Sequence, residues 1–400
     1  MDKLNKILLP YINQGRYPGI QWQINVNGER YAGKLGYKNL ETKDKISDDT
    51  IYRIWSMTKP VIAIATMQLV ERNKIQLDDP ITKYLPEYSN LKVLKNPDGD
   101  ITDVEELKIV PTVKHLLLHT AGFSYNFLAD PVGMEYERVK IFKSTSSSLE
   151  EEIQMLAKIP LLHQPSTQWR YSVSIDVLAR ILEIVENSSL QDILKNKIFL
   201  PLGMYDTDFS INERNESRVM QSYEFDIVHH KLREHILDPQ NPQKTGNYGY
   251  PLHNKNYARG GHGLFSTLYD YSLFAGMLHS GKTKDGKLII AKETIDFMTS
   301  NFLTPSFLPI EIASVGTIKD ENYVNDLEAY GWGLGFRTLL DPVKNNNLGT
   351  KGEFGWAGAA STYFLVDNHK KISAILMTQV LNGDPNLKKD FYKFIYTHFK

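Results

Sequence analysis

Apolar residues near the N-terminus first follow a helical spacing and then a strand-like one. Four of them recur at helical intervals: Leu4, Ile7, Leu8 and Ile12. Residues 20–26 then alternate between apolar and polar side chains. The Asn27-Gly28 pair that follows is a favoured two-residue hairpin turn, because both residues tolerate a positive φ. The pattern predicts an amphipathic helix followed by a β-hairpin.

A second pair of strands is predicted near the C-terminus. Residues 361–367 (STYFLVD) and 372–379 (ISAILMTQ) have strand-like composition, and a polar turn around Asp367-Asn368-His369 joins them. Residues 386–400 form the last predicted helix. Because strands gather at both ends of the chain, we expect the two ends to build one sheet.

The middle of the chain has helical spacing instead. Residues 111–122 predict a helix stopped by Gly122, and residues 174–187 predict one that ends near Asn187. Residues 270–281 predict another helix with a glycine stop. The predicted fold class is α/β of the α+β type, with an antiparallel sheet flanked by helices and a mostly helical domain inserted into it.

Two domains follow from this pattern. Residues 1–76 and 260–400 form the predicted sheet domain, and residues 77–259 form the inserted domain. Two segments, at about 211–258 and about 301–330, are polar and irregular. Loops of that length are usually functional or mobile, and a solvated insertion explains either segment equally well.

The composition excludes several kinds of chemistry. The 400 residues are 42% hydrophobic and 23% charged, as is ordinary for a soluble globular protein. The formal net charge is −1, so nothing favours a nucleic-acid partner or an anionic membrane surface. The chain has no cysteine, which excludes disulfides, thiolate catalysis and cysteine-bound zinc, and which agrees with a reducing compartment.

The N-terminal segment lacks the long apolar core and the small-residue cleavage site of a secretory signal. No stretch approaches the roughly 18 apolar residues of a membrane span. We therefore expect a cytoplasmic protein without a membrane span, and the oligomeric state stays open.

The strongest candidate for chemistry is the pair Ser56 and Lys59. The stretch that follows them, PVIAIATMQLV, is almost entirely apolar and predicts a buried helix with Ser56 at its N-terminus and Lys59 one turn on. A helix N-terminus presents free N–H groups and a positive dipole end to a developing oxyanion. The amine can take the serine proton if burial lowers its pKa.

This spacing alone does not establish a catalytic pair. An N-capping serine followed by a solvated lysine gives the same spacing, and Ser89 and Lys92 repeat it in a stretch without a helical pattern. The apolar setting favours Ser56, because a lysine between Trp55 and a buried helix is costly unless its amine is used.

Two further elements could complete a serine–lysine site. Tyr171 directly precedes the helix predicted at 174–187 and could pass a proton to the leaving group, although most of the 22 tyrosines are expected in the core or on the surface. Gly358 lies in a glycine-rich turn before an apolar strand, where the N–H of Ala359 could donate to an oxyanion. Taken alone, this turn is better explained as a hairpin entry that needs glycines.

Other motifs are incomplete. The chain has no Gly-x-Ser-x-Gly, no P-loop and no complete Gly-x-Gly-x-x-Gly. The stretch HHKLREH at 229–235 misses the metalloprotease spacings, and His115 and His119 are interpreted as structural. We therefore expect neither a metal nor a cofactor.

In combination, the Ser-x-x-Lys, Tyr and glycine-turn elements resemble those of the serine β-lactamase and penicillin-recognising superfamily. The resemblance is greatest to its class C β-lactamase-like branch, which includes the family VIII carboxylesterases. It covers nearly the whole chain and runs through SDDTIYRIWSMTKP, QLDDPITKYLP, VKHLLLHTAGF, YSVSIDVLARILEIV, PLGMYDTDF, GGHGLFSTLYDYSLFAGML and GWAGAASTYFLVD. It implies a β-lactamase/transpeptidase-like fold with the site in the cleft between the domains.

The resemblance gives each matching residue a role. Ser56 matches the family's nucleophile, Lys59 the motif lysine, and Tyr171 the first position of the Tyr-x-Asn motif. Trp356-Ala357-Gly358 lies where the lactamases carry Lys-Thr-Gly. Ala359 would then supply the second oxyanion-hole N–H beside that of Ser56.

Two positions depart from the lactamase pattern. Val173 replaces the Asn of Tyr-x-Asn and has no amide to hold a β-lactam side chain. Trp356 replaces the Lys of Lys-Thr-Gly and cannot pair with a substrate carboxylate. Both changes remove recognition groups and leave the acyl-transfer groups intact, which is similar to family VIII esterases and their Trp-x-Gly.

The resemblance therefore implies a serine hydrolase that cleaves a small-molecule carboxylic ester through an acyl-enzyme on Ser56. It also implies a substrate pocket formed by Val173 and residues 356–358. Whether Lys59 or Tyr171 is the acylation base stays open. The alternatives are a β-lactamase or D,D-peptidase, an acyltransferase that uses an alcohol in place of water, and a non-catalytic binding protein on the same scaffold.

Overall fold

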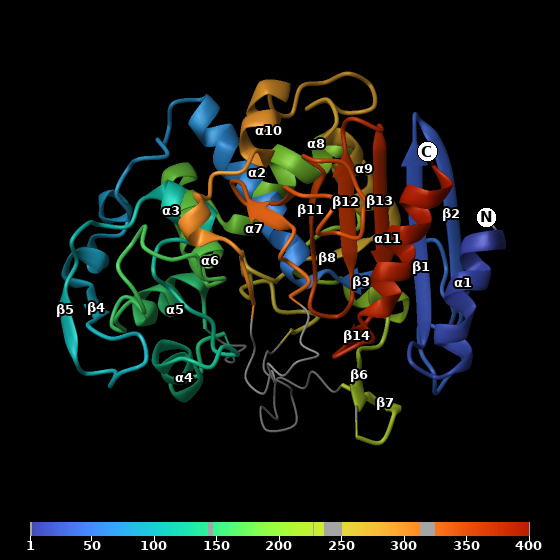
Figure 1. Cartoon of the computed structure of the whole chain (residues 1–400), viewed down its shortest axis with the longest axis horizontal. Coiled ribbons are helices and arrows are strands. Elements are labelled where there is room, and N and C mark those ends of the chain that lie inside the picture. Colours follow the sequence, from blue (N-terminus) through green and yellow to red (C-terminus); the bar gives the residue numbers. More distant parts are fainter. Residues whose placement is uncertain (1, 143–146, 227, 236–249, 313–324, 400) are drawn as a thin grey trace.

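The central element of the fold is a seven-stranded antiparallel sheet with the order β2-β1-β13-β12-β11-β10-β9 (Figure 1). The computed structural model describes residues 2–142, 147–226, 228–235, 250–312 and 325–399. The strands of the sheet are β1 (Gly19–Val26), β2 (Glu29–Gly36), β9 (Tyr330–Trp332), β10 (Arg337–Leu339), β11 (Phe354–Ala357), β12 (Tyr363–Asp367) and β13 (Ile372–Met377).

The two ends of the chain meet within this sheet, one strand in from its β2 edge. Strand β1 pairs with β13 along its length, so the N-terminal hairpin is continuous with the C-terminal strands. Asn27 and Gly28 both have a positive φ, of 51° and 87°, as a two-residue hairpin turn requires. The predicted sheet from both termini is therefore confirmed.

Helices cover both faces of the sheet. On one face lie α1 (Asp2–Asn13) and α11 (Asn386–His398), which share an apolar cluster with β1 and β13. On the other face, α9 (Leu268–Met277) packs against β13, and α2 (Thr58–Glu71) and α10 (Lys292–Thr299) lie in the same layer (Figure 1). The predicted α+β fold class is confirmed.

The remaining helices gather beside the sheet part, in the segment between α2 and β8. They are α3 (Val113–Leu118), α4 (Pro131–Arg138), α5 (Leu149–Leu156), α6 (Ser174–Glu186), α7 (Leu190–Leu194) and α8 (Leu200–Leu202), with a π-turn at Lys195–Phe199. Helix α6 packs against α2, α3 and α5. Because α2 is buried from Thr58 to Leu69, it forms the shared wall between the helical part and the sheet part.

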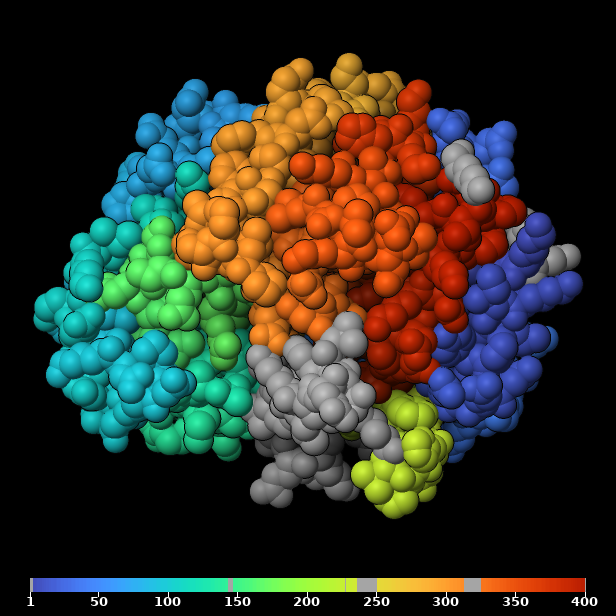
Figure 2. Space-filling view, in the orientation of Figure 1, coloured from blue at the N-terminus to red at the C-terminus, as the bar shows by residue number. Residues whose placement is uncertain are grey.

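Short strands and 3-10 turns complete the chain. The strands are β3 (Ile51–Arg53), β4 (Lys92–Leu94), β5 (Val104–Glu106), β6 (Tyr223–Asp226), β7 (Lys231–Glu234), β8 (Phe265–Thr267) and β14 (Val380–Leu381). The 3-10 turns are η1 (Trp55–Met57), η2 (Ile81–Lys83), η3 (Pro86–Asn90), η5 (Glu213–Arg218) and η6 (Pro305–Phe307). Figure 2 shows the described residues between α10 and β10, 300–312 and 325–336, lying between the helical part and the C-terminal strands.

The two polar segments are partly structured. Strands β6 and β7 lie within the first of them, and β6 pairs with β14 from the C-terminal part, so this segment is attached to the sheet side. Residues 227, 236–249 and 313–324 lie outside the described part of the chain. The division into domains at residues 77 and 260 stays a prediction.

Two helix ends differ from the sequence-based prediction. Helix α3 ends at Leu118, where His119 takes the left-handed conformation with a φ of 56°, rather than at Gly122. Gly122 instead allows close packing, because a Cβ there would lie 2.3 Å from the carbonyl oxygen of His163. Helix α9 ends at Met277, and Gly281 forms the turn after it with a φ of 74°.

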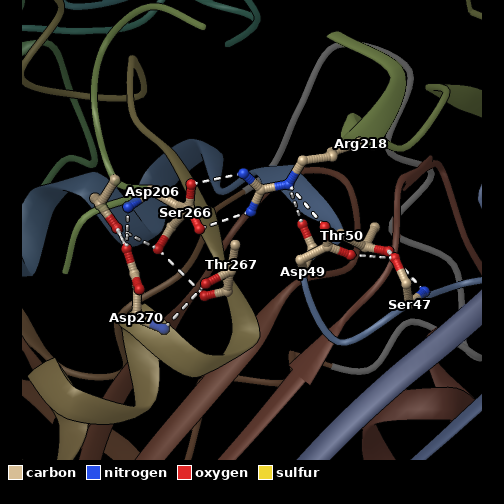
Figure 3. Close-up of polar contacts among 9 residues, drawn as sticks. Ser47, Asp49, Thr50, Asp206, Arg218, Ser266, Thr267 and Asp270 are labelled. Carbon is tan, nitrogen blue, oxygen red and sulfur yellow. Dashed lines mark hydrogen bonds and ion pairs between the residues drawn. The ribbon is translucent and has the colours of Figure 1, made fainter. Parts of the chain in front are cut away.

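A polar cluster connects three separate segments of the chain (Figure 3). Arg218 donates two hydrogen bonds to Asp206 and also pairs with Asp49 of the N-terminal part. Asp270, in the first turn of α9, accepts hydrogen bonds from the backbone N–H of Asp206 and the hydroxyl of Thr207. We call these residues, Asp49, Asp206, Thr207, Arg218 and Asp270, the Arg218 cluster. The cluster holds the segment after α8 against the start of α9.

No described helix has the length and apolar character that crossing a bilayer requires.

Candidate active site

Ser56 lies in the 3-10 turn η1, which runs directly into α2, so it stands two residues before the helix begins at Thr58. The residue before it, Trp55, has a φ of 48°, which is strained for an aromatic residue. Its ring packs against Tyr250 and His262, with centroids 5.0 and 6.3 Å away. Packing therefore holds a strained backbone at Trp55, directly before Ser56, as is common at functional sites.

Lys59 is brought to Ser56 by the first turn of α2. Its Nζ donates to Ser56 Oγ at 3.2 Å and to the carbonyl oxygen of Gly261 at 2.6 Å. The side chain is only 1% exposed, and the ammonium lies over the rings of Tyr125 and Tyr171. The amine is therefore fixed at hydrogen-bond distance from the candidate nucleophile.

The environment of Lys59 favours its neutral form. Burial lowers the pKa of the Lys59 ammonium from its ordinary value to about 7, and the nearby carboxylate of Asp176 acts in the opposite direction. A neutral amine can accept a proton, so a substantial fraction of Lys59 is able to act as a base near neutral pH.

Tyr171 completes a triangle with these two residues. Burial raises the pKa of its phenol above the ordinary range, and interactions with Ser56 and Trp356 act in the opposite direction. Trp356 donates its indole N–H to Tyr171 Oη at 3.2 Å. Because an indole N–H can only donate, the phenol oxygen is the acceptor there, and its own proton is free to point to Ser56 or a substrate.

The glycine-rich third element lies against the nucleophile's turn. Trp356 and Ala357 end strand β11, and a Cβ at Gly358 would lie 2.4 Å from the carbonyl oxygen of Ile54, two residues before Ser56. Only a glycine fits this approach without a shift of the backbone. Ala359 follows, and it lines the same cleft as Ser56.

A cavity of 480 Å³ opens at Ser56. Aromatic residues form much of its wall: Trp55, Tyr125, Phe127, Tyr171 and Trp356. Two cations also border it, Arg337 and Lys388, and each has an acidic partner, Glu353 at 3.4 Å and Asp326 at 3.9 Å. The wall of the cavity is therefore largely aromatic, and the two cations that border it are paired with acidic groups.

One predicted substrate contact is not brought to the cleft. Val173 is fully buried in the main core and begins α6, where its carbonyl oxygen accepts the N–H groups of Asp176 and Val177. It does not line the cavity. The other predicted residues all come together: Ser56, Lys59, Tyr171, Trp356, Ala357, Gly358 and Ala359.

The residues that the sequence offered as alternatives have other contacts. Ser89 is exposed and donates to the carbonyl oxygen of Pro86, while Lys92 pairs with Glu106. His229 pairs with Asp226 on the surface. Within the described ranges, no three His, Asp or Glu side chains gather in a group that could hold a metal ion.

Several buried groups around Lys59 were not predicted as part of the site, and one of them, His119, is interpreted from the sequence as structural. His119 packs on the ring of Tyr171 at 4.9 Å, and His262 lines the cleft. Burial, with the charge of Lys59 next, lowers the pKa of both imidazoles well below the ordinary value, so both are neutral at pH 7. Asp176 and Gly261 also lie beside Lys59. An acid on the apolar face of a helix is the sequence signal for Asp176, and the cluster Gly260-Gly261-His262-Gly263 is the signal for Gly261.

A family model described as Beta-lactamase matches residues 4–395. Protein Rv1367c of Mycobacterium tuberculosis is 30% identical over 373 residues, which cover 90% of this chain and 87% of that protein. Esterase EstB of Burkholderia gladioli is 26% identical over 354 residues, covering 87% of this chain and 82% of the esterase.

A solved structure shares the fold. EstCE1, described as a hydrolase with promiscuous acyltransferase activity, superposes with a TM-score of 0.81 at 22% identity, covering 99% of this chain and 98% of the other. The β-lactamase/transpeptidase-like fold expected from the sequence is therefore confirmed, as is the resemblance to the superfamily.

Proposed function

The chain belongs to the β-lactamase family and is a serine hydrolase, and from this premise we propose that it cleaves carboxylic esters through an acyl-enzyme on Ser56. Ser56 Oγ forms a bond to the ester carbonyl carbon while its proton passes to Lys59. The N–H groups of Ser56 and Ala359 hold the oxyanion that develops. The alkoxide leaves with a proton delivered through Lys59 and Tyr171, and water then releases the acid and restores Ser56.

The choice of base follows from the two environments. Lys59, with its pKa lowered to about 7, is partly neutral at physiological pH. The phenol of Tyr171, with its pKa raised by burial, stays protonated. We therefore assign Lys59 as the base that accepts the Ser56 proton, and Tyr171 as the group that passes a proton to the leaving oxygen.

The observation that carries the ester preference is the position of Trp356. The indole lies in the cleft next to Tyr171, where the lactamases of the family carry a lysine, and it is only 6% exposed. A β-lactam carboxylate would lose a charged hydrogen bond there, which is worth roughly 1.5–3 kcal/mol. An uncharged ester has no carboxylate to pair, and EstB, a relative across most of the chain, carries the name of an esterase.

The test compares kcat/KM for p-nitrophenyl butyrate and for a chromogenic cephalosporin, in the native protein and in Trp356→Lys. We expect the native protein to prefer the ester, and the variant to shift the ratio towards the cephalosporin by about 10- to 100-fold. A native preference for the cephalosporin would overturn the proposal. An unchanged ratio in Trp356→Lys would leave the ester preference standing but would remove this explanation of it.

Acyl transfer to an alcohol is a second candidate function. The aromatic wall of the cleft could hold an apolar alcohol against the acyl-enzyme, and EstCE1 is described as having promiscuous acyltransferase activity. The test adds a primary alcohol during turnover and measures the ratio of new ester to free acid. A ratio no higher than that of the uncatalysed reaction would reject this function.

A further inference from the structure

A buried carboxylate lies beside the site without a role in the steps above. Asp176, in the first turn of α6, is 0% exposed. Its Oδ1 accepts the backbone N–H of Gly261 at 2.8 Å, and its Oδ2 is buried without a hydrogen-bond partner among the described residues. A buried carboxylate with an unsatisfied oxygen is costly, and in a native structure it requires an explanation.

Gly261 connects this carboxylate to Lys59. The N–H of Gly261 donates to Asp176, and its carbonyl oxygen accepts the Lys59 amine at 2.6 Å. A Cβ at Gly261 would lie 2.3 Å from Asp176 Oδ2 and 2.7 Å from Tyr125 Oη. The close approach of residue 261 to Asp176 therefore needs a glycine. Asp176 holds the backbone of Gly261 in place, and the carbonyl of Gly261 in turn holds the Lys59 amine.

The other charged groups around this bridge are balanced. Arg259 and Glu152 form a fully buried ion pair at 2.9 Å. His119 and His262 are neutral, and the phenol of Tyr171 is protonated because burial raises its pKa. Tyr257, whose ring faces Arg259, stays protonated at neutral pH because burial raises the pKa of its phenol. Burial raises the pKa of Asp176 to about 6, and above that pH its carboxylate is the charge that opposes the effect of burial on Lys59.

We propose that Asp176 is a positioning residue for Lys59: through Gly261 it aligns the amine with Ser56, and its carboxylate is the buried countercharge for the ammonium that forms when Lys59 takes the Ser56 proton. This inference rests on the proposed function of Ser56 and Lys59. The arrangement follows the logic of a catalytic triad, in which a third group orients the base and stabilises its charged form. Here the orienting contact runs through one backbone residue.

The test measures how fast Ser56 is phosphonylated by an uncharged p-nitrophenyl phosphonate diester between pH 5 and pH 9, with the adduct followed by intact mass. In this reaction Ser56 Oγ bonds to phosphorus, nitrophenolate leaves, and the serine proton passes to Lys59. In Asp176→Asn we expect the plateau rate to fall by about 10- to 100-fold. The acidic limb of the plot of rate against pH should move to lower pH by about one pH unit. The reason is that the Lys59 ammonium loses its countercharge, which lowers its pKa.

Asp270→Asn is the matched control. Asp270 is also a buried aspartate in the first turn of a helix that accepts a backbone N–H, but it belongs to the Arg218 cluster. The Asp270→Asn variant should keep the native plateau rate and the native position of the acidic limb of the rate–pH profile. The proposal is overturned if Asp176→Asn keeps the native limb and rate, or if it loses rate only in proportion to a lowered Tm.

Gly261→Ala is a second variant that keeps both charges. Because its methyl group would collide with Asp176 Oδ2, we expect a folded protein whose plateau rate falls by at least about 10-fold. A folded Gly261→Ala with the native rate and limb would also overturn the proposal. If Ser56 is phosphonylated with the expected shifts but esters are not turned over, the proposed function fails and this inference stands. If esters are turned over but the acidic limb of the rate–pH profile is unmoved in Asp176→Asn, the proposed function stands and this inference fails.

Discussion

Among single residues, the protonation states at neutral pH decide which group can act as the base in the proposed mechanism. Lys59 must be neutral to accept the Ser56 proton, and burial lowers the pKa of its ammonium to about 7. We therefore expect kcat/KM for an uncharged ester to fall as the pH decreases through about 7, with an apparent pKa that belongs to Lys59 and Asp176 together. The measurement is a pH–rate profile with p-nitrophenyl butyrate. A kcat/KM that is constant from pH 5.5 to pH 8 would contradict the assignment of Lys59.

The indole of Trp356 gives a second prediction at this scale. Trp356→Phe keeps an aromatic ring but removes the N–H that donates to Tyr171, so the phenol loses one fixed contact. We expect kcat to fall by about 10-fold, because the proton donor is less well oriented. The matched control is Trp22→Phe, since Trp22 is also a buried strand residue whose indole donates to a side-chain oxygen, that of Asn5 at 3.0 Å. If kcat fell equally in Trp356→Phe and Trp22→Phe, Trp356 would contribute through packing alone.

At the scale of elements, the turn η1 and helix α2 determine where the nucleophile stands. The 3-10 turn brings Ser56 to the end of the buried helix, and the strained φ of Trp55 is held by contacts from the loop that carries Tyr250 and His262. That loop also supplies Gly261. The nucleophile and the alignment of its base therefore depend on one connecting segment that lies far from Ser56 in sequence.

The Arg218 cluster gives a prediction about stability. Burial, with the charge of Asp206 in addition, raises the pKa of Asp270 from 3.8 to about 6. The folded protein therefore binds more protons than the unfolded chain between about pH 4 and pH 6, and this group makes stability fall as the pH rises through that window. In Asp270→Asn this contribution is absent.

The measurement is urea unfolding of both proteins at pH 4 and pH 7. We expect the difference in free energy of unfolding, native minus Asp270→Asn, to be smaller at pH 7 than at pH 4. The upper limit of this change is about 3 kcal/mol. A difference that is the same at both pH values would show that Asp270 titrates as it does in the unfolded chain.

At the scale of the whole molecule, residues with strong local patterns were predicted from the sequence and residues defined by packing were not. The hairpin at Asn27-Gly28 and the end of α6 at Asn187 follow from local backbone preferences, and the structure has both. The stop of α3 was placed at Gly122 because a glycine usually ends a helix, whereas packing against His163 uses that glycine instead.

The candidate site shows the same division. The spacing of Ser56 and Lys59 is local, Tyr171 is a candidate because it directly precedes a predicted helix, and the resemblance indicates Trp356. Asp176 acts through Gly261, a contact between segments 85 positions apart in the chain, so no local pattern reveals it. Val173 was assigned to the pocket by its motif position, but the turn before α6 directs it into the core.

The proposed mechanism requires that Ser56 carries the acyl group during turnover, and the mass of the enzyme in that state tests this requirement. The protein is mixed with a p-nitrophenyl ester, quenched in acid within milliseconds, digested and analysed by mass spectrometry. The account predicts an acyl adduct on the peptide that contains Ser56, no adduct in Ser56→Ala together with a loss of activity of at least about 10³-fold, and no change in Ser89→Ala. An adduct on another residue, or ester hydrolysis that persists in Ser56→Ala, would contradict it.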